Sequence, residues 1–348
     1  MVQQINGRQK SARGEKICPE KKTPKINNAE LLINLVYTKN TTYKMFTVSK
    51  RTLLRLSTFQ QLRRTTTQRR RSASSAPINI ANLLVKPALF TSFVVGGSFG
   101  VTAVVERLNV LQLPAWAVEM NRKTPYLWPF VAPVILANAA IFMLWHRPLP
   151  PFFLDRLFLS HPGIPTASAM LGSTFSHKTV MHLGFNMFAF YGFARATCHS
   201  VGSGDAASMY LTCGVVSSWV AGVVTSFHPL LRALRMPSLG ASGAVLGLVS
   251  FSAFSRPDME VSLIFLPMIS FPAIQALAGL VLFDCVGLVL GWRALGHAAH
   301  LAGVGCGALF HFGGLDMARK YQREVRLKVD MAKRWYRDRI KQMNTKKK

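Results

Sequence analysis

Two polar residues lie inside apolar stretches long enough to cross a membrane. One is Ser242, in the run GASGA at residues 240–244, and the other is His300. A hydroxyl is a poor nucleophile until a neighbouring base takes its proton, so a serine becomes a catalytic candidate when a histidine can reach it. The pair therefore predicts serine hydrolase chemistry inside a bilayer, provided that helices exist to bring the two side chains together.

A third apolar stretch adds two hydrogen-bond donors. His182 and Asn186 are four residues apart, which places both side chains on one face of a predicted helix. Ser242 lies near the start of its own predicted helix, where unpaired backbone N–H groups and the helix dipole favour negative charge. Polar residues are costly in a membrane, so each needs a partner or a task. A nucleophile, a base and oxyanion donors are the parts that acyl transfer requires.

Small residues near both candidates predict close packing of their helices. The strips consist of Gly243 and Gly247 in one stretch and Gly303 and Gly307 in the other, with Gly240 before the candidate serine. Such strips let two helix backbones approach closely. Because a serine side chain is short, a hydrogen bond between Ser242 and His300 requires this closeness. Taken singly, a serine beside glycine or an intramembrane histidine is usually structural, and only the combination favours catalysis.

The composition is that of a membrane protein. Half of the 348 residues are hydrophobic and 16% are charged, which is too apolar for an ordinary soluble domain. A hydrocarbon core about 30 Å thick needs roughly 20 apolar residues per helix. Candidate spans lie at 87–105, 128–145, 179–197, 206–227, 238–254, 272–292 and 297–314. We therefore expect an all-α polytopic membrane protein, with a connector at 148–175 that dips into the membrane interface.

Most of the net charge of +28 resides in the two flanks of the chain, and the centre carries +5. Residues 1–80 carry 17 Lys and Arg against three acids, and residues 316–348 carry 13 against four. A nucleic-acid-binding surface would interleave basic residues with a folded reading element, so we predict no nucleic-acid partner. The basic carboxy-terminal segment is expected either to contact anionic lipid headgroups or to remain a solvated tail.

The amino-terminal segment has the composition of a mitochondrial transit peptide. Ten positive charges lie between Lys39 and Arg71 among many Ser and Thr residues, and no acid occurs from residue 31 to residue 105. The best part begins at Met45, which is an alternative start to Met1. The competing interpretation is a disordered basic tail on a plasma-membrane or secretory protein. No short apolar segment with a small-residue cleavage site follows, which counts against a secretory signal.

Neither a metal nor a cofactor is expected. The cysteines show no CxxC spacing and suggest no disulfide framework: Cys18, Cys198, Cys213, Cys285 and Cys306. A metal site could be imagined from four histidines, namely His177, His182, His297 and His300. This set of residues lacks the HExxH pattern and a carboxylate at ligand spacing, so a metal site is the least favoured interpretation of the polar residues.

Three short motifs resemble the rhomboid intramembrane serine proteases: GASG at 240–243, HLGFN at 182–186 and AHLAG at 299–303. One span ahead of a six-span core, the transit-like leader, and the phrases STFSH at 173–177 and HAAH at 297–300 narrow the resemblance to the mitochondrial, presenilin-associated rhomboid-like branch. The resemblance covers residues 165–312 by motif and the remainder by layout. It implies a six-helix rhomboid core plus one extra amino-terminal transmembrane helix, in the mitochondrial inner membrane.

The resemblance also implies a role for each candidate residue. Ser242 resembles the nucleophile and His300 the general base and acid. His182 and Asn186 resemble the side chains that hold the oxyanion together with the Ser242 backbone N–H. The family works with a Ser–His dyad. Asp284 in the sixth stretch is a candidate for a third, orienting member, but a structural acid hydrogen-bonded within the bundle is favoured.

Two neighbouring residues qualify these roles. His297 shares a helix face with His300 and competes with it for the role of base, but only His300 has the Ala-His-x-x-Gly context of the family. Many bacterial rhomboids carry an aromatic residue four positions after the nucleophile, packed on the catalytic histidine. This chain has Leu246 there, so the rest of the pocket must hold His300.

These inferences divide the chain into four parts. They are a basic disordered leader with a transit peptide at 1–80, an extra transmembrane helix and loop at 81–127, a six-helix rhomboid core at 128–314, and a basic tail at 315–348. The predicted activity is endoproteolysis of single-span membrane proteins in the lipid bilayer. The resemblance implies imported mitochondrial proteins as substrates and links to mitophagy and apoptosis. The alternatives are a catalytically inactive rhomboid-like scaffold and, less favoured because no internal repeat is evident, a transporter or channel.

Overall fold

The computed structural model describes residues 80–108, 114–124, 126–148, 151–161, 166–227, 237–263, 266–292 and 295–345. The predicted transit peptide and the alternative start at Met45 lie outside these residues. The helices that position the site are α7 (Val180–Val201), α8 (Ser203–Phe227), α10 (Ser242–Ser255), α11 (Ala273–Val289) and α12 (His297–Leu309).

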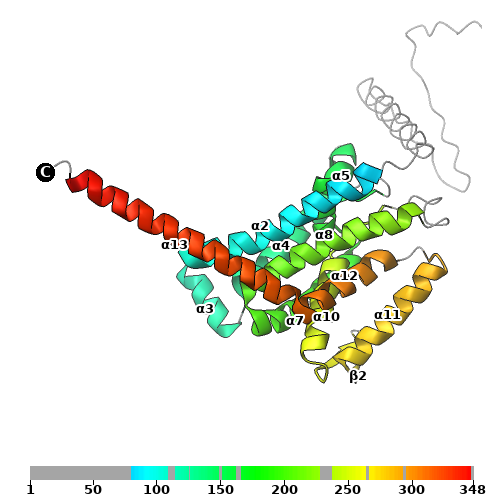
Figure 1. The fold of residues 1–348 in the computed structure, drawn as a ribbon. Helices are drawn as coiled ribbons and strands as arrows, with labels where there is room; N and C mark the ends of the chain where they lie inside the picture. The colour runs from blue at the N-terminus through cyan, green and yellow to red at the C-terminus, as the bar shows by residue number, and fades with distance from the viewer. Residues whose placement is uncertain are drawn as a thin grey trace, which may run out of the picture. The chain divides into compact units, whose positions relative to one another are not determined.

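The remaining elements precede, connect or follow these five helices (Figure 1). They are η1 (Ala81–Val85), α2 (Lys86–Leu108), α3 (Ala115–Lys123), η2 (Leu127–Val131), α4 (Ala132–Trp145), α5 (Pro151–Phe158), α6 (Ala167–Gly172), η3 (Ser173–Phe175), η4 (Phe310–Gly314) and α13 (Leu315–Thr345). Strands β1 (Glu260–Leu263) and β2 (Leu266–Pro272) form an antiparallel hairpin between α10 and α11.

The expected helical membrane fold is confirmed, because every predicted span is occupied by a helix. Among the described residues, three helical segments are long and apolar enough to cross a membrane by themselves, namely Ala81–Leu108, Ser203–Phe227 and His297–Thr345. Three shorter apolar helices are Ala132–Trp145, Ser242–Ser255 and Ala273–Val289. The connector after α4 forms α5, α6 and η3, and apolar residues before α11 form the β-hairpin, neither of which hydropathy alone could specify.

The core lies around α8, which is buried along most of its length. Tyr210 on α8 is fully buried and packs against Phe130 and Phe190, with ring centroids 6.0 Å and 5.2 Å away. Phe130 and Phe190 also meet edge to face at 5.4 Å. Aromatic pairs in this geometry add stability beyond the area they bury. They fix η2 and α7 against α8, and so fix the helix that carries His182.

Helices α10 and α12 touch backbone to backbone. A Cβ atom added to Gly303 would lie 2.1 Å from the Gly243 carbonyl oxygen, and one added to Gly307 would lie 2.0 Å from the Gly247 carbonyl oxygen. No side chain fits into such a gap, so glycine is required at both positions of α12. The two glycine strips thus bring together the helices that carry Ser242 and His300.

We expect Gly307→Ala to destabilise the protein and Gly305→Ala to leave it as stable or more stable. The added methyl group at Gly307 meets backbone, which cannot move aside as a side chain can, and overpacking of this kind costs about 1–3 kcal/mol. Gly305 is a matched control, because it lies on the same helix with nothing within 4 Å of an added Cβ. Thermal unfolding in detergent micelles measures both variants. Equal unfolding midpoints would contradict this account of the α10–α12 contact.

The basic carboxy-terminal segment is a 31-residue helix, α13, where the sequence suggested a tail. It lies beside α2 (Figure 1) and is joined to the bundle by ion pairs. Arg319 and Gln322 donate to Asp205 at the start of α8, at 3.1 Å and 2.9 Å, and Arg326 pairs with Glu106 on α2 at 2.7 Å. The carboxylates of Asp205 and Glu106 therefore hold α13 against α8 and α2.

Candidate active site

Ser242 is the first residue of α10 and follows a tight turn. Gly240 in this turn has φ +132°, which favours glycine, and a Cβ there would lie 2.8 Å from Cε1 of His182. The turn is held from outside: the Gly240 N–H donates to the Ser173 carbonyl at 2.9 Å, and the Ala241 N–H donates to Nε2 of His177 at 3.4 Å. Because Ser242 begins the helix, its backbone N–H has no partner within the helix.

The structure brings Ser242 and His300 into hydrogen-bond contact. The Oγ atom of Ser242 lies 2.9 Å from Nε2 of His300, within the range expected of a nucleophile and its base. His300 lies in the first turn of α12, where its N–H donates to the Gly296 carbonyl at 3.0 Å. Its side chain is 13% exposed, so the imidazole is largely shielded from solvent while its Nε2 faces the serine.

Asp284 on α11 lies behind His300. Nδ1 of His300 is 3.1 Å from Oδ1 and 3.2 Å from Oδ2 of Asp284, whose side chain is 1% exposed. An ionised carboxylate only accepts hydrogen bonds, so with Asp284 ionised the Nδ1–H donates to it and the Nε2 lone pair is left to face Ser242. Asp284 is thus hydrogen-bonded within the bundle, as expected of a structural acid, and the same contact places Ser242, His300 and Asp284 in the arrangement of a Ser–His–Asp triad.

His297 shares the same carboxylate. Its Nδ1 lies 2.6 Å from Oδ1 of Asp284, and its ring is 3% exposed. The ring also packs against Gly287, where an added Cβ would lie 2.4 Å from its Cε1 atom. His297 thus contacts Asp284 instead of Ser242, which separates it from His300 as a candidate base. Two imidazoles on one carboxylate fix the orientation of Asp284 from two sides.

His182 and Asn186 lie on α7, but their side chains have different neighbours. The Thr179 side chain caps α7 by accepting the His182 N–H at 3.2 Å, which sets where this helix begins. The His182 ring lies against Gly240, two residues before Ser242. Asn186 is buried one turn later, and its Nδ2 donates to the His182 carbonyl at 2.8 Å. The amide keeps a second N–H for another acceptor.

Leu246 is buried in the core and has no aromatic ring to offer to His300. The orientation that such a ring would give is supplied instead by the Asp284 carboxylate and by the edge of His297, whose ring centroid is 6.4 Å from that of His300. Within the described ranges, no three His, Cys, Asp or Glu side chains converge as metal ligands. The contacts of His300 with Ser242 and Asp284 can supply proton transfer and nucleophilic attack from protein side chains.

His177 and the segment around it support the site in a way that sequence reasoning missed. This histidine lies in the loop between η3 and α7, where it is fully buried and accepts the Ala241 N–H. Burial, with a smaller contribution from the neighbouring His182 ring, lowers the pKa of His177 to about 3. His177 is therefore neutral in the folded protein. The signal available in the sequence was the STFSH phrase itself, five residues before His182.

We expect His177 to make the protein less stable as the pH falls below about 6.5. The unfolded chain then binds a proton at His177 that the folded protein, with a pKa of about 3, does not bind. Each pH unit between these limits costs at most about 1.4 kcal/mol. His177→Gln is the control, since its side-chain oxygen can accept the Ala241 N–H without titrating. Between pH 7 and pH 5, the thermal unfolding midpoint should fall further in the wild type than in His177→Gln. An equal fall in the two proteins would contradict a neutral, buried His177.

Comparisons with known proteins agree with the motifs. A rhomboid domain is matched at residues 166–316. The presenilin-associated rhomboid-like protein, mitochondrial, of Mus musculus is 34% identical over 200 residues, 57% of this chain and 52% of that protein. Presenilin-associated rhomboid-like protein A, mitochondrial, of Danio rerio is 36% identical over 174 residues, 50% of this chain and 44% of that protein.

A more distant relative is Rhomboid protein 1, mitochondrial, of Saccharomyces cerevisiae, 29% identical over 202 residues, which are 57% of this chain and 56% of that protein. The chain thus spans about half the length of the curated relatives that it matches. The matched domain contains all the residues of the site described above. Residues 166–316 match the model of the rhomboid domain, and mitochondrial rhomboid-like proteins are among the relatives of the chain.

Proposed function

We propose that this protein is an intramembrane serine endopeptidase that cleaves transmembrane segments through an acyl-enzyme. The observation that carries the proposal is the contact of 2.9 Å between Ser242 Oγ and His300 Nε2, with Asp284 on the opposite nitrogen of the same imidazole. A scaffold that only binds membrane clients has no need for a nucleophile, a base and an orienting acid in register. Chance seldom assembles all three at hydrogen-bond distance inside a bundle.

In the first half of the reaction, His300 Nε2 takes the proton of Ser242 as Oγ attacks the scissile carbonyl carbon. The electron pair of the C=O bond moves to the oxygen, which becomes the oxyanion of a tetrahedral intermediate. When that intermediate collapses, the C–N bond breaks and the imidazolium returns its proton to the leaving amine. Asp284 stabilises the imidazolium throughout and keeps its ring oriented.

The oxyanion is assigned to donors at the start of α10 and on α7. The Ser242 backbone N–H is unpaired within the helix, His182 lies against the preceding Gly240, and Asn186 retains one N–H. Donors fixed in place before the reaction stabilise developing charge most effectively. In the second half, His300 activates a water molecule that attacks the ester carbon, and Ser242 leaves with the proton restored.

The substrates proposed are single-span membrane proteins whose helices unwind near one end. Helical hydrogen bonds hide the scissile carbonyl, so an extended segment is needed for attack. Among the described residues, three helical segments are long and apolar enough to cross a membrane, and the relatives of the chain are named as mitochondrial. Together with the transit-like leader, these names support a location in the mitochondrial inner membrane and imported proteins as substrates.

The proposal is tested by reconstituting the full chain in liposomes with a single-span substrate that carries a helix-destabilising residue near one end. We expect cleavage within the transmembrane segment, and mass spectrometry of the two products identifies the bond. A matched substrate with a stable polyleucine helix should resist cleavage. Binding of the substrate without any product, in protein whose helical content is intact, would support the scaffold and overturn the protease.

Asn186→Ala should lower kcat about a hundredfold without abolishing cleavage, because removal of one oxyanion donor typically has this effect. Asn138→Ala is a matched control. Asn138 is also buried, and its Nδ2 donates to the Val134 carbonyl at 2.8 Å, the same helical pattern as the bond from Asn186 to the His182 carbonyl. Both variants lose one such bond, so both lose stability. An equal loss of kcat per folded molecule would show that Asn186 is only structural.

A further inference from the structure

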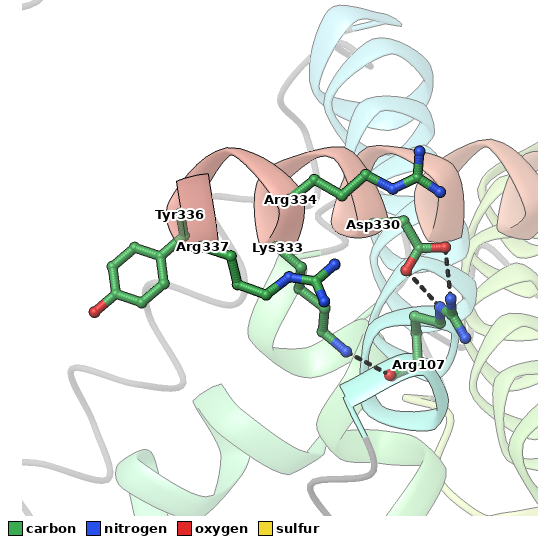
Figure 2. A pocket seen from close by; sticks show the side chains of 6 residues that line it. All are labelled: Arg107, Asp330, Lys333, Arg334, Tyr336 and Arg337. Carbon is green, nitrogen blue, oxygen red and sulfur yellow. Dashed lines mark hydrogen bonds and ion pairs between the residues drawn. The ribbon is translucent and has the colours of Figure 1, made fainter. Parts of the chain in front are cut away.

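A basic cavity lies where the end of α2 meets the distal half of α13. Its volume is about 440 Å³, and Figure 2 shows its lining side chains. They are Arg107, Asp330, Lys333, Arg334, Tyr336 and Arg337. Four cations thus surround one carboxylate. None of these residues takes part in the chemistry proposed for Ser242.

The single carboxylate is already fully engaged. Arg107 binds Asp330 through two parallel hydrogen bonds, from Nε at 2.6 Å and from Nη2 at 2.7 Å, and Lys333 donates to the Arg107 carbonyl at 2.9 Å (Figure 2). These contacts close one side of the cavity. Among the described residues, Arg334 and Arg337 have no carboxylate within ion-pair distance. Two guanidinium groups are therefore left for an anion, and their planar forks match phosphate oxygens.

The position of the cavity along α2 indicates where that anion comes from. Arg107 lies in the last turn of the helix that ends the apolar segment Ala81–Leu108, which is long enough to cross a membrane. The end of a membrane-spanning helix lies at the level of the lipid headgroups. A cavity lined by cations at this level therefore faces the phosphates of the lipids.

An apolar stripe on the same helix supports this source. Leu327, Met331 and Trp335 recur every four residues, on one helix face, and are 63%, 61% and 67% exposed. A basic helix with such a face lies in the membrane interface, with tryptophan and tyrosine at headgroup level. A second copy of the chain could also cover the stripe, but it would bring the same cations against those of the cavity. Charge complementarity thus favours an anionic lipid.

We propose that the cavity between α2 and α13 binds the phosphate of an anionic phospholipid through Arg334 and Arg337, with the acyl chains against the exposed stripe of α13. The bound lipid holds the distal half of α13 to the membrane surface. This site is independent of the proposed protease activity, and its test reads binding alone.

The test titrates the full chain in dodecyl maltoside micelles with short-chain phosphatidylglycerol, phosphatidylcholine or inorganic phosphate, and follows binding by calorimetry and native mass spectrometry. We expect saturable binding of phosphatidylglycerol and none of phosphatidylcholine. The double variant Arg334→Gln with Arg337→Gln should weaken binding at least about tenfold, since each cation near an anionic lipid contributes about 1 kcal/mol to the binding free energy. The control is Arg323→Gln with Arg339→Gln, two exposed arginines of α13 outside the cavity, with the same change in charge.

The control variant is expected to bind within about twofold of the wild type. Equal weakening in both double variants would overturn the site in favour of general attraction between the basic helix and anionic lipid. Binding of inorganic phosphate as tight as that of phosphatidylglycerol would overturn the lipid as its source. Because all four arginines are exposed or line a cavity, circular dichroism should show the same helical content in both double variants. If the cavity variant alone loses helical content, the double variant Arg334→Lys with Arg337→Lys replaces it, and this variant must retain binding.

Discussion

Ser242→Ala is expected to abolish cleavage of a reconstituted single-span substrate. The hydroxyl oxygen is the atom that forms the acyl-enzyme, and alanine offers no replacement for it. In the wild type, His300 Nε2 lies 2.9 Å from this oxygen, so the base is positioned to activate the serine hydroxyl. Product formation in liposomes, followed over many wild-type turnovers, measures the effect. Cleavage of the same bond by the purified variant would contradict the assignment of the nucleophile.

The matched control for this prediction is Ser250→Ala. Ser250 lies on the same helix, α10, and also reaches α12, where its Oγ donates to the Val304 carbonyl at 2.8 Å. Loss of that bond costs about 1 kcal/mol of stability, which is the usual contribution of one hydrogen bond. We therefore expect slightly lower thermal stability and wild-type kcat from Ser250→Ala. Parallel loss of activity in both serine variants would point to disruption of the α10–α12 contact, which Ser242→Ala should leave intact.

Asp284→Asn is expected to lower kcat by about 10² to 10⁴ with little change in KM. An asparagine amide can donate to Nδ1 of His300, which then carries its proton on Nε2. In this tautomer Nε2 cannot accept the proton of Ser242. Asp284 is 1% exposed and faces two histidines, so it has no contact with substrate. Its effect therefore belongs to the chemical step. Steady-state kinetics on protein of verified helical content separates kcat from KM.

Asp205→Asn is the control for a buried acid outside the site. Asp205 is also buried, and it accepts from Arg319 and Gln322 at the contact of α8 with α13. Its replacement should lower stability and leave kcat per folded molecule unchanged. If Asp284→Asn instead behaved like Asp205→Asn, the dyad expected from the sequence would be restored, and Asp284 would be a structural acid after all.

Hydropathy was sufficient to locate a helix in each predicted span, because a membrane span must be both long and apolar. The β-hairpin and α3 were not expected, since short elements depend on tertiary contacts that no periodicity encodes. The extent of α13 was missed for a different reason. Its helix is charged throughout, and its place is set by pairs such as Arg326 with Glu106, far apart in the chain.

The sequence predicted which residues form the site, but not all of the contacts between them. Ser242, His300 and the glycine strips stood out because each is unusual in an apolar stretch, and the strips explain why the two side chains meet. The sequence offered two roles for Asp284, an orienting third member and a structural acid, and could not decide between them, since its contact with His300 depends on the rotation of α11 relative to α12. In the structure, His297 contacts Oδ1 of Asp284 and His300 contacts both carboxylate oxygens, which defines that rotation.

The central claim is that His300 activates Ser242 for acyl transfer. The most direct measurement treats the reconstituted full chain with a fluorophosphonate, which modifies only activated serines, and identifies the modified residue by peptide mass spectrometry. We predict one adduct, on Ser242, in the wild type and its loss in the His300→Asn variant at equal helical content. An unmodified Ser242 in the wild type, or equal modification in the His300→Asn variant, would contradict the claim.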